Sequence, residues 1–216
     1  MDEMEDETFV RAAYQVKGKG RNDRLWVAPK GENLLFSFLK KDPEYLKNGA
    51  KLSCIIACIV SKTIGKVTGL TQSIKWPNDI YIHGKKAVGI LLQGKLPLGI
   101  VIGIGINVNQ KEFLGEYRIP PTSLSLEVGK DIDIDALYQT LTDALIEPIQ
   151  LDEIHRYFDD HDYLKNKTIE YLKDDEIRSG IVIGVDEEFR LLIQNKDVIE
   201  AVTSGEIRSI ITKGQE

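Results

Sequence analysis

The chain has 216 residues, of which 42% are hydrophobic and 29% are charged, and its formal net charge is −6. This composition is typical of a globular protein, the length allows one large core or a core plus a small satellite, and the negative charge argues against a general nucleic-acid binder. The acidic start lacks the basic and apolar parts of a secretory signal, and no apolar run reaches the length of a membrane span, so we expect a cytoplasmic protein with no membrane partner.

The first third of the chain predicts two strands, a cationic loop and a buried helix. Residues 8–16 and 33–39 read as strands, and residues 17–24 between them form a loop with two glycines, four cationic side chains and nothing apolar. Residues 50–64 are apolar nearly all round, which predicts a helix buried against a sheet. Cys54 and Cys58 lie four residues apart in this helix, and we interpret them as core residues rather than as a metal pair or a thiol couple.

The stretch Lys75-Trp76-Pro77-Asn78-Asp79 interrupts an otherwise apolar, alternating sequence. Pro77 removes a backbone donor, and the two residues after it are turn formers, so the stretch predicts a corner between two strands. A basic side chain, a tryptophan and two short polar side chains would converge at this corner. That combination favours a functional site over a plain hairpin.

Two further strands follow, at residues 86–93 and 98–108. Gly99, Gly103 and Gly105 in the second of them share one face, because side chains alternate between the faces of a strand. A face bare of side chains lets a helix, a backbone or a ligand approach closely. Residues 109–125 form a long connection without a clear period, which favours a functional loop.

The end of the chain changes from helices to short strands. Asp133 or Asp135 is expected to cap a helix that carries a leucine at every fourth position and ends at Ile146, and a second helical piece follows at residues 151–158. Five short strands come after residue 163, with turns at residues 174–175, 186–188, 195–197 and 204–205, as in a small antiparallel barrel or sandwich. We therefore predict an α+β fold with a main domain over residues 1–162 and a small β domain over residues 163–216.

Several side chains are candidates for binding an anionic ligand. The cationic loop can fold over a phosphate or carboxylate or be a solvated surface loop, and it matches neither the dinucleotide nor the nucleoside-triphosphate glycine pattern. Lys86 is either a snorkelling edge residue or a fixed cation aimed at a reacting carboxylate or phosphate. Trp26 is either a core aromatic or a surface on which a purine stacks, and Asn107 either caps a turn or binds a ligand. No nucleophile triad or zinc pattern is found, so the expected chemistry is electrostatic, with Mg²⁺.

These motifs, in this order, resemble the biotin protein ligases of the biotin/lipoate ligase superfamily. Residues 15–26 are similar to the Gly-Arg-Gly-Arg loop of the family, with Lys19 in place of the first arginine, and residues 75–79 are its most recognisable motif. Residues 86–91 and 103–109 resemble the two strand signatures that follow, and residues 122–124 resemble a conserved tripeptide of the family. The resemblance implies a mixed β-sheet flanked by helices, as in class II aminoacyl-tRNA synthetases, followed by a small SH3-like β-barrel.

The resemblance also implies a two-step reaction: ATP with Mg²⁺ activates biotin to biotinyl-5′-AMP, and the biotin then passes to a lysine of a biotin carboxyl carrier domain. It implies catalytic roles for Lys86 and Arg21 and a magnesium ligand in Asp79. It implies substrate or nucleotide binding by Gln15, Gly18, Lys19, Gly20, Arg21, Trp26, Asn78, Lys86, Gly89 and Asn107. The glycine-rich loop is expected to be mobile when empty and ordered by ligand.

Two other functions remain open on the same residues. One is a lipoate ligase or acyltransferase on the same scaffold. The other is an inactive module that binds an acceptor domain or ligand, because the Ser-Thr-Asn segment that precedes the first strand in the family has no counterpart here. No helix-turn-helix pattern is found, so we expect no DNA binding, and a homodimer through the edge of the main sheet is open by analogy.

Overall fold

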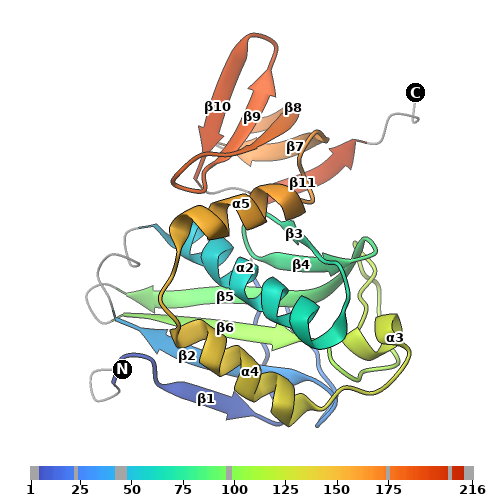
Figure 1. Ribbon diagram of the computed structural model, residues 1–216. Coiled ribbons are helices and arrows are strands. Elements are labelled where there is room, and N and C mark those ends of the chain that lie inside the picture. Colours follow the sequence, from blue (N-terminus) through green and yellow to red (C-terminus); the bar gives the residue numbers. More distant parts are fainter. Residues whose placement is uncertain are drawn as a thin grey trace.

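The computed structural model describes residues 5–21, 24–41, 48–95, 99–173, 176–203 and 206–211. They form two antiparallel sheets, with helices packed on one face of the larger sheet (Figure 1). The predicted α+β class is confirmed. Asn22 and Asp23 of the cationic loop, and the predicted turns at residues 174–175 and 204–205, lie outside the described residues.

The larger sheet has six strands in the order β1-β2-β6-β5-β4-β3. They are β1 (Phe9–Ala12), β2 (Leu34–Lys40), β3 (Ser73–Lys75), β4 (Asp79–Ile82), β5 (Lys85–Lys95) and β6 (Gly99–Ile106). Every neighbouring pair is antiparallel, so the expectation of a mixed sheet is wrong. The reason is that the crossover through helix α2 joins β2 to β3, which run in the same direction but are separated by β6, β5 and β4.

Helix α2 (Gly49–Thr68) crosses the larger sheet as a buried element. The side chain of Asn48 caps its start by accepting a hydrogen bond from the backbone N–H of Lys51 at 3.1 Å. The helix continues beyond the predicted residue 64 because Gly69, with φ of 72°, takes the left-handed conformation that ends a helix. Its apolar surface packs against the sheet on one side and against the later helices on the other.

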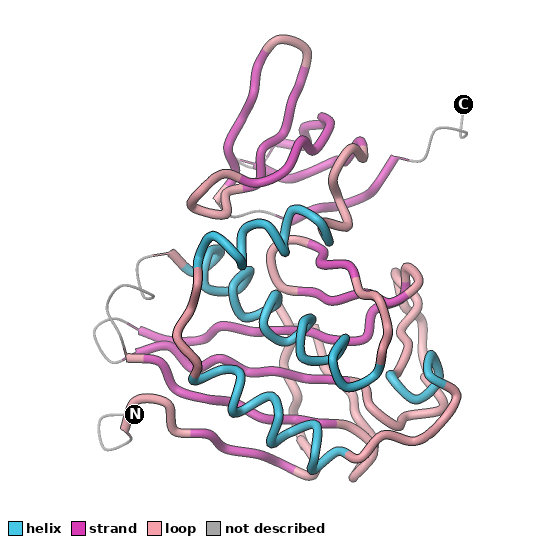
Figure 2. Tube along the Cα trace, in the orientation of Figure 1, coloured by secondary structure: helices cyan, strands magenta, loops and turns pink. Residues whose placement is uncertain are grey.

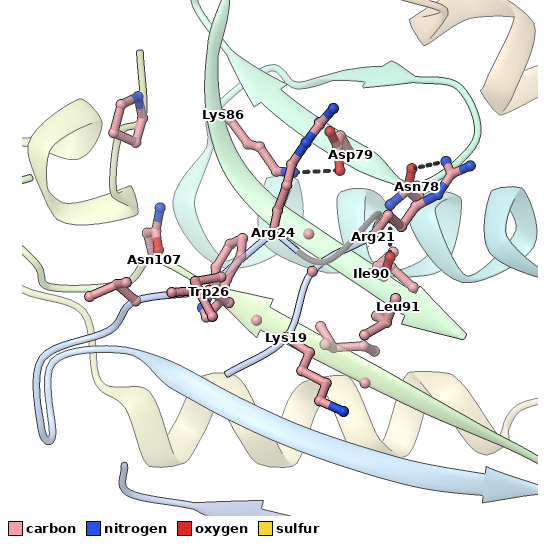
Figure 3. A pocket seen from close by; sticks show the side chains of 18 of the residues that line it. Lys19, Arg21, Arg24, Trp26, Asn78, Asp79, Lys86, Ile90, Leu91 and Asn107 are labelled. Carbon is pink, nitrogen blue, oxygen red and sulfur yellow. Dashed lines mark hydrogen bonds and ion pairs between the residues drawn. The ribbon is translucent and has the colours of Figure 1, made fainter. Parts of the chain in front are cut away.

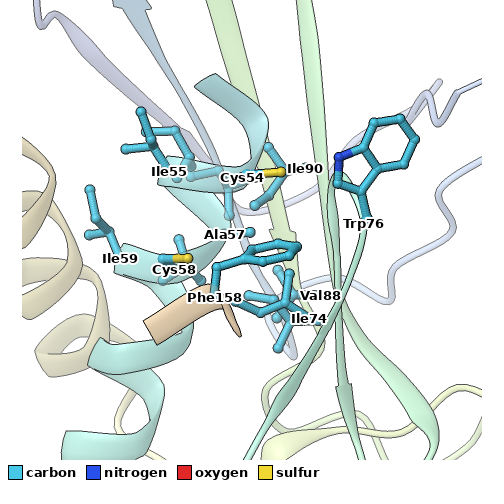
Figure 4. Packing of buried hydrophobic residues seen from close by; sticks show 14 of the residues in the cluster. Cys54, Ile55, Ala57, Cys58, Ile59, Ile74, Trp76, Val88, Ile90 and Phe158 are labelled. Carbon is cyan, nitrogen blue, oxygen red and sulfur yellow. The ribbon is translucent and has the colours of Figure 1, made fainter. Parts of the chain in front are cut away.

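Cys54 and Cys58 belong to the hydrophobic core that this helix forms. Both are free and fully buried, and Figure 4 shows them among Ile74, Val88 and Phe158. Burial raises the pKa of both thiols, which keeps them protonated and unreactive. The prediction that they are core residues is confirmed.

The later helices are α3 (Leu124–Val128), α4 (Ile134–Ile146) and α5 (Leu151–His161). Of these, α4 and α5 pack against α2 on the same face of the sheet (Figure 2). Asp133 caps α4 by accepting from two backbone N–H groups, and the three predicted leucines of α4 are buried. The expectation that helices flank the sheet is confirmed on the face that α2 covers.

The smaller sheet has five strands in the order β10-β9-β8-β7-β11. They are β7 (Thr168–Lys173), β8 (Glu176–Val185), β9 (Leu191–Asn195), β10 (Val198–Val202) and β11 (Glu206–Ile211). The five short strands are confirmed. β10 and β11 are the two edges, and within the described strands no pairing joins them, so the closed SH3-like barrel is not confirmed.

A single hydrophobic core includes residues of both sheets, from Leu34 in β2 to Val202 in β10. The predicted domain boundary after residue 162 stays a prediction. In the part of the chain that the structure describes, no helix is both long enough and apolar enough to cross a membrane.

Candidate active site

A cavity of about 780 Å³ lies on the face of the larger sheet opposite α2. The alternation of β6 separates this face from the core: Ile102 and Ile106 are buried with α2, whereas Gly103 and Gly105 line the cavity. The rest of the wall comes from the cationic loop, β2, the β3–β4 turn, β5, the connection before α3 and β11. Segments far apart in the sequence therefore meet at one hollow.

The cationic loop is folded as a narrow hairpin. The N–H of Gly20 donates to the carbonyl oxygen of Arg24 at 2.6 Å, and the N–H of Trp26 donates to that of Gly18 at 2.9 Å. A Cβ at Gly18 would lie 2.2 Å from the Trp26 carbonyl oxygen, so only glycine fits there. Gly18 shapes the hairpin but is not part of the cavity wall, which differs from its expected binding role.

The other expected residues of this loop do reach the cavity. They are Gln15, Lys19, Gly20 and Arg21. The structure adds Lys17 and Arg24, whose charges the sequence shows but whose direction it does not. The loop thus presents several cations to one hollow, as the anion-binding interpretation requires.

Trp26 lies flat across two glycines of the sheet. A Cβ at Gly89 would lie 2.8 Å from Trp26 Cζ3, and a Cβ at Gly105 would lie 2.6 Å from Trp26 Cε2. The indole Nε1 is buried without a hydrogen-bond partner, and Lys86 Nζ lies 5.8 Å from the ring centroid. The expectation that the bare face of β6 admits a close neighbour is confirmed, and that neighbour is an aromatic side chain that itself lines the cavity.

The β3–β4 turn places two polar side chains beside the cationic loop (Figure 3). Asn78 donates through Nδ2 to the Ile90 carbonyl oxygen at 2.8 Å and accepts through Oδ1 from Arg21 Nη1 at 3.1 Å. Asp79 forms an ion pair with Lys86, with 2.7 Å between Oδ1 and Nζ. The predicted corner between two strands is confirmed. It contacts the cationic loop through Arg21 and also contacts Lys86.

Lys75, at the start of this corner, also lines the cavity. Burial lowers the pKa of its ammonium group; Asp79 opposes this effect, and the positive charges of Arg118, Lys86 and Arg24 add to it. Four cations gathered around one carboxylate repel one another, and an anionic ligand would relieve that repulsion. The electrostatics of the site thus favour a highly charged anion.

Asn107 ends β6 at the far side of the cavity. It is buried, and its Nδ2 donates to the Thr122 carbonyl oxygen at 3.0 Å. The side chain therefore holds the connection before α3 in place while it lines the cavity. Both interpretations of Asn107, structural support and ligand contact, fit this position.

Arg118 and Ile207 line the cavity without having been expected there. Arg118 Nη2 donates to the Ile207 carbonyl oxygen at 3.2 Å, which links the connection before α3 to β11 of the smaller sheet. The long connection gave a general signal for a functional loop, but nothing in the sequence singles out Ile207. Its presence depends on the packing of the smaller sheet.

The described residues form no preformed metal site: no three His, Cys, Asp or Glu side chains lie close enough together to bind one ion. Asp79 and Glu116 are the cavity-lining carboxylates. Mg²⁺ commonly binds through one or two carboxylates together with substrate phosphates and water, so Asp79 fits the chemistry of a magnesium ligand. That role stays a prediction.

Comparisons with known proteins place this geometry in a family. The sequence model of the Biotin/lipoate A/B protein ligase family matches residues 1–107. The bifunctional ligase/repressor BirA of Bacillus subtilis is 38% identical over 132 residues, which is 58% of this chain and 41% of that protein. BirA of Escherichia coli is 28% identical over 208 residues, which is 91% of this chain and 64% of that protein.

Comparison of the fold with solved structures also points to biotin protein ligases. The biotin protein ligase of Aquifex aeolicus in complex with biotin and ATP superposes with a TM-score of 0.85 and 28% identity, over 96% of this chain and 90% of that one. The matched segment spans less than two thirds of either BirA protein. The motif order, the six-stranded antiparallel sheet and the cation-lined cavity agree with these matches, and residues 1–107 carry the sequence pattern of the biotin/lipoate A/B protein ligase family.

Proposed function

We propose that the protein is a biotin protein ligase, which activates biotin with ATP to biotinyl-5′-AMP and transfers biotin to a lysine of a biotin carboxyl carrier domain. The observation that carries this proposal is the convergence of Arg21, Asn78, Asp79 and Lys86 beside Trp26 in one cavity. The Aquifex aeolicus protein that superposes on this chain binds biotin and ATP. This match favours a biotin ligase over a lipoate ligase or an inactive module.

In the first step an oxygen of the biotin carboxylate attacks the α-phosphorus of ATP, and the bond to pyrophosphate breaks. Both reactants are anions, so the protein has to neutralise charge and align the two groups. Lys86 Nζ and the guanidinium of Arg21 are the cations placed to do so, and each is held by a partner at the corner. In the second step the lysine amine of the acceptor attacks the carbonyl carbon of the mixed anhydride, and AMP leaves.

The nucleotide has a defined place in this proposal. The face of Trp26 would stack on adenine, with Gly89 behind the indole and Asn107 near the base. The triphosphate would lie toward Lys75, Lys86, Arg21 and Arg24. Magnesium, when bound with ATP, would reduce the phosphate charge, and Asp79 is the residue that would hold it.

Biotin would occupy the part of the cavity formed by β2, β5 and β6. Its wall includes Ser37, Leu91, Gln93 and Gly103, a mixture of apolar surface and a few polar groups that suits a small ligand. Gln15, Gly20 and Lys19 of the cationic loop would close over biotin and the adenylate. The loop would become more ordered as the ligand binds.

The partners of the protein follow from the same proposal. Its protein substrate would be the carrier domain of a biotin-dependent carboxylase, met in the cytoplasm. Absence of DNA binding and a homodimer through the edge of the larger sheet stay predictions.

The proposal is tested by incubating the protein with biotin, Mg²⁺ and ATP labelled at the α-phosphate. Biotinyl-AMP and pyrophosphate are expected, and a carrier domain added afterwards should gain biotin. Lys86→Met should lower the rate of adenylate formation by at least about a hundredfold. Lys62→Met, on the exposed face of α2, is the matched control and should leave the rate unchanged.

Two outcomes would overturn the proposal. Adenylate formation with lipoate but not with biotin would indicate the lipoate ligase. A folded protein that binds biotin but forms no adenylate would indicate the inactive module.

A further inference from the structure

Trp76 differs from its neighbours in the β3–β4 turn. Lys75, Asn78 and Asp79 present polar groups to the cavity, whereas Trp76 is only 3% exposed. Its indole Nε1 donates a hydrogen bond to the carbonyl oxygen of Phe189 at 2.8 Å. A residue of the reacting corner is thus tied to a turn of the smaller sheet.

The turn that offers this carbonyl is internally fixed. Asp186 Oδ1 accepts from the N–H of Glu188 at 3.1 Å and from the N–H of Arg190 at 2.9 Å, and the N–H of Phe189 donates to the Asp186 carbonyl at 2.8 Å. Phe189 has a positive φ of 56°, which a phenylalanine adopts only when its surroundings hold it there. Its buried ring packs edge-on against Phe158 of α5 at 5.8 Å.

The same turn is also docked on the helices of the larger sheet. Asn48 Nδ2 donates to the Glu188 carbonyl oxygen at 3.1 Å, and Lys51 Nζ lies 2.9 Å from Glu188 Oε1. His155 Nε2 lies 3.1 Å from the Asp186 carbonyl oxygen. The Phe189 carbonyl is therefore a fixed point relative to α2 and α5, and not the end of a free loop.

The corner is also held from the side of β5 and of the cationic loop. Asn78 is held to β5 by the hydrogen bonds that link it to Ile90, while Lys75 and Asp79 reach the cavity from the neighbouring positions. A displacement of reacting groups by about 1 Å can lower a rate about a hundredfold. Trp76, between these residues in the chain, also borders the cavity, and its indole N–H fixes the corner from the side of the smaller sheet.

We propose that Trp76 is a positioning residue, which uses the Phe189 carbonyl of the smaller sheet to hold Lys75, Asn78 and Asp79 in their reacting geometry. It touches neither substrate nor nucleotide and acts through its neighbours. The smaller sheet thereby contributes to the activation step through one buried hydrogen bond. This inference rests on the proposed function and assigns to it a buried residue at the cavity wall.

The test is Trp76→Phe, which keeps an aromatic ring and removes the N–H donor. The single-turnover rate of biotinyl-AMP formation is expected to fall by at least about tenfold. The Kd of biotin alone should change by less than about twofold, because the corner belongs to the triphosphate end of the cavity. Both are measured below the melting temperature of the variant.

Phe158→Leu is the matched control, since it weakens the packing beneath Phe189 without removing the N–H donor. It should lower the melting temperature to a similar extent and keep the single-turnover rate within about twofold of the parent. Equal loss of rate in both variants, or an unchanged rate in Trp76→Phe, would overturn the proposal and make Trp76 a core residue only.

Asp186→Ala provides a second variant in case Trp76→Phe does not fold. It opens the turn that presents the Phe189 carbonyl while leaving the larger sheet intact, so the rate should fall with biotin binding preserved. An unchanged rate in folded Asp186→Ala would overturn the proposal. The parent protein separates the two hypotheses. If the parent forms no adenylate, the proposed function fails. The positioning role of Trp76 is judged on the ratio of the single-turnover rates of variant and parent.

Discussion

At the residue scale, the shape of the cavity depends on where side chains are absent. Gly89 and Gly105 lie under the indole of Trp26, with no room for a Cβ at either position. Gly103 is on the same face of β6, but a Cβ there would meet its nearest atoms at 3.6 Å, an ordinary contact. Gly105 is therefore required for the packing of Trp26 on β6, whereas Gly103 has room for a Cβ, and alanine substitution at each position can measure the difference.

Gly105→Ala is expected to displace Trp26 and to weaken nucleotide binding by about tenfold, which is about 1.4 kcal/mol. The indole would have to move away from β6 to relieve the 2.6 Å contact. Isothermal titration with a non-hydrolysable ATP analogue in the presence of biotin measures the effect. Gly103→Ala is the control, and equal Kd values for the two variants would contradict the assignment of Trp26 to the nucleotide site.

At the element scale, one carboxylate fastens the connection before α3 to the start of β5. Glu127 accepts from Thr122 Oγ1 at 2.5 Å and lies 2.6 Å from His83 Nδ1 and 3.2 Å from Lys85 Nζ. Burial by itself would raise its pKa, but these hydrogen bonds outweigh burial and hold the pKa at about 2. Thr122 in turn pairs with Lys86 through the backbone, so Glu127 supports the catalytic strand.

Glu127→Gln should lower the free energy of unfolding by about 1 kcal/mol at pH 7, or about 3 °C in melting temperature. A carboxyl group whose pKa is depressed stabilises the folded state above its ordinary pKa of 4.5, and this stability is lost as pH falls toward about 2. The difference between parent and variant should therefore shrink between those two values in thermal melts across pH. A difference that persists at pH 2 would contradict the assignment.

The junction between α5 and β7 contains a carboxyl group whose pKa is raised, whereas that of Glu127 is lowered. Asp162 is largely buried, its Oδ2 has no hydrogen-bond partner, and its Oδ1 accepts from the N–H of Leu164 at 2.8 Å. Burial raises its pKa to about 6; the bond from Leu164 lowers the pKa, and Asp159 raises it further. Ionisation of Asp162 therefore costs more free energy in the folded state than in the unfolded state.

Asp162→Asn is expected to raise the free energy of unfolding by about 1–2 kcal/mol at pH 7.5. A raised pKa means that the parent loses stability as pH rises from 3.8 to about 6 and does not recover it above that range. The variant keeps an acceptor for Leu164 and carries no charge, so its advantage should vanish near pH 4. Urea denaturation at both pH values measures this, and a less stable variant at pH 7.5 would contradict it.

At the scale of the whole molecule, the two sheets share one hydrophobic core and are joined by several hydrogen bonds and ring contacts. The indole of Trp76 binds Phe189, and Arg118 binds the Ile207 carbonyl. Phe158 of α5 packs between the layers against Phe189. Separate unfolding of the smaller sheet would expose these groups, so the chain should behave as a single cooperative unit.

Urea unfolding followed by circular dichroism and by tryptophan fluorescence should give coincident transitions. The two tryptophans of the chain report on different places, so Trp26→Phe leaves Trp76 as a probe of the junction between the sheets. Its fluorescence transition should match the loss of secondary structure. A fluorescence change at lower urea would contradict shared unfolding and support independent domains on either side of residue 162.

The sequence determined the features that depend on neighbours along the chain. These are the α+β class, the helix caps, the buried cysteine helix, the cationic loop, the bare face of β6 and the corner at residues 75–79. They are readable because capping, turn formation and side-chain alternation act over a few residues. The family motifs added the expected roles of Lys86, Arg21 and Asn107.

Only the tertiary structure decided which distant segments meet. It made every strand pairing in the described residues antiparallel, left the smaller sheet open in the described strands, and packed α2, α4 and α5 on one face. It joined the indole N–H of Trp76 to the Phe189 carbonyl, and it brought Arg118 and Ile207 to the cavity. The contacts of Trp76 and Arg118 join residues more than eighty positions apart, and local sequence patterns carry no information about which remote partner a side chain will find.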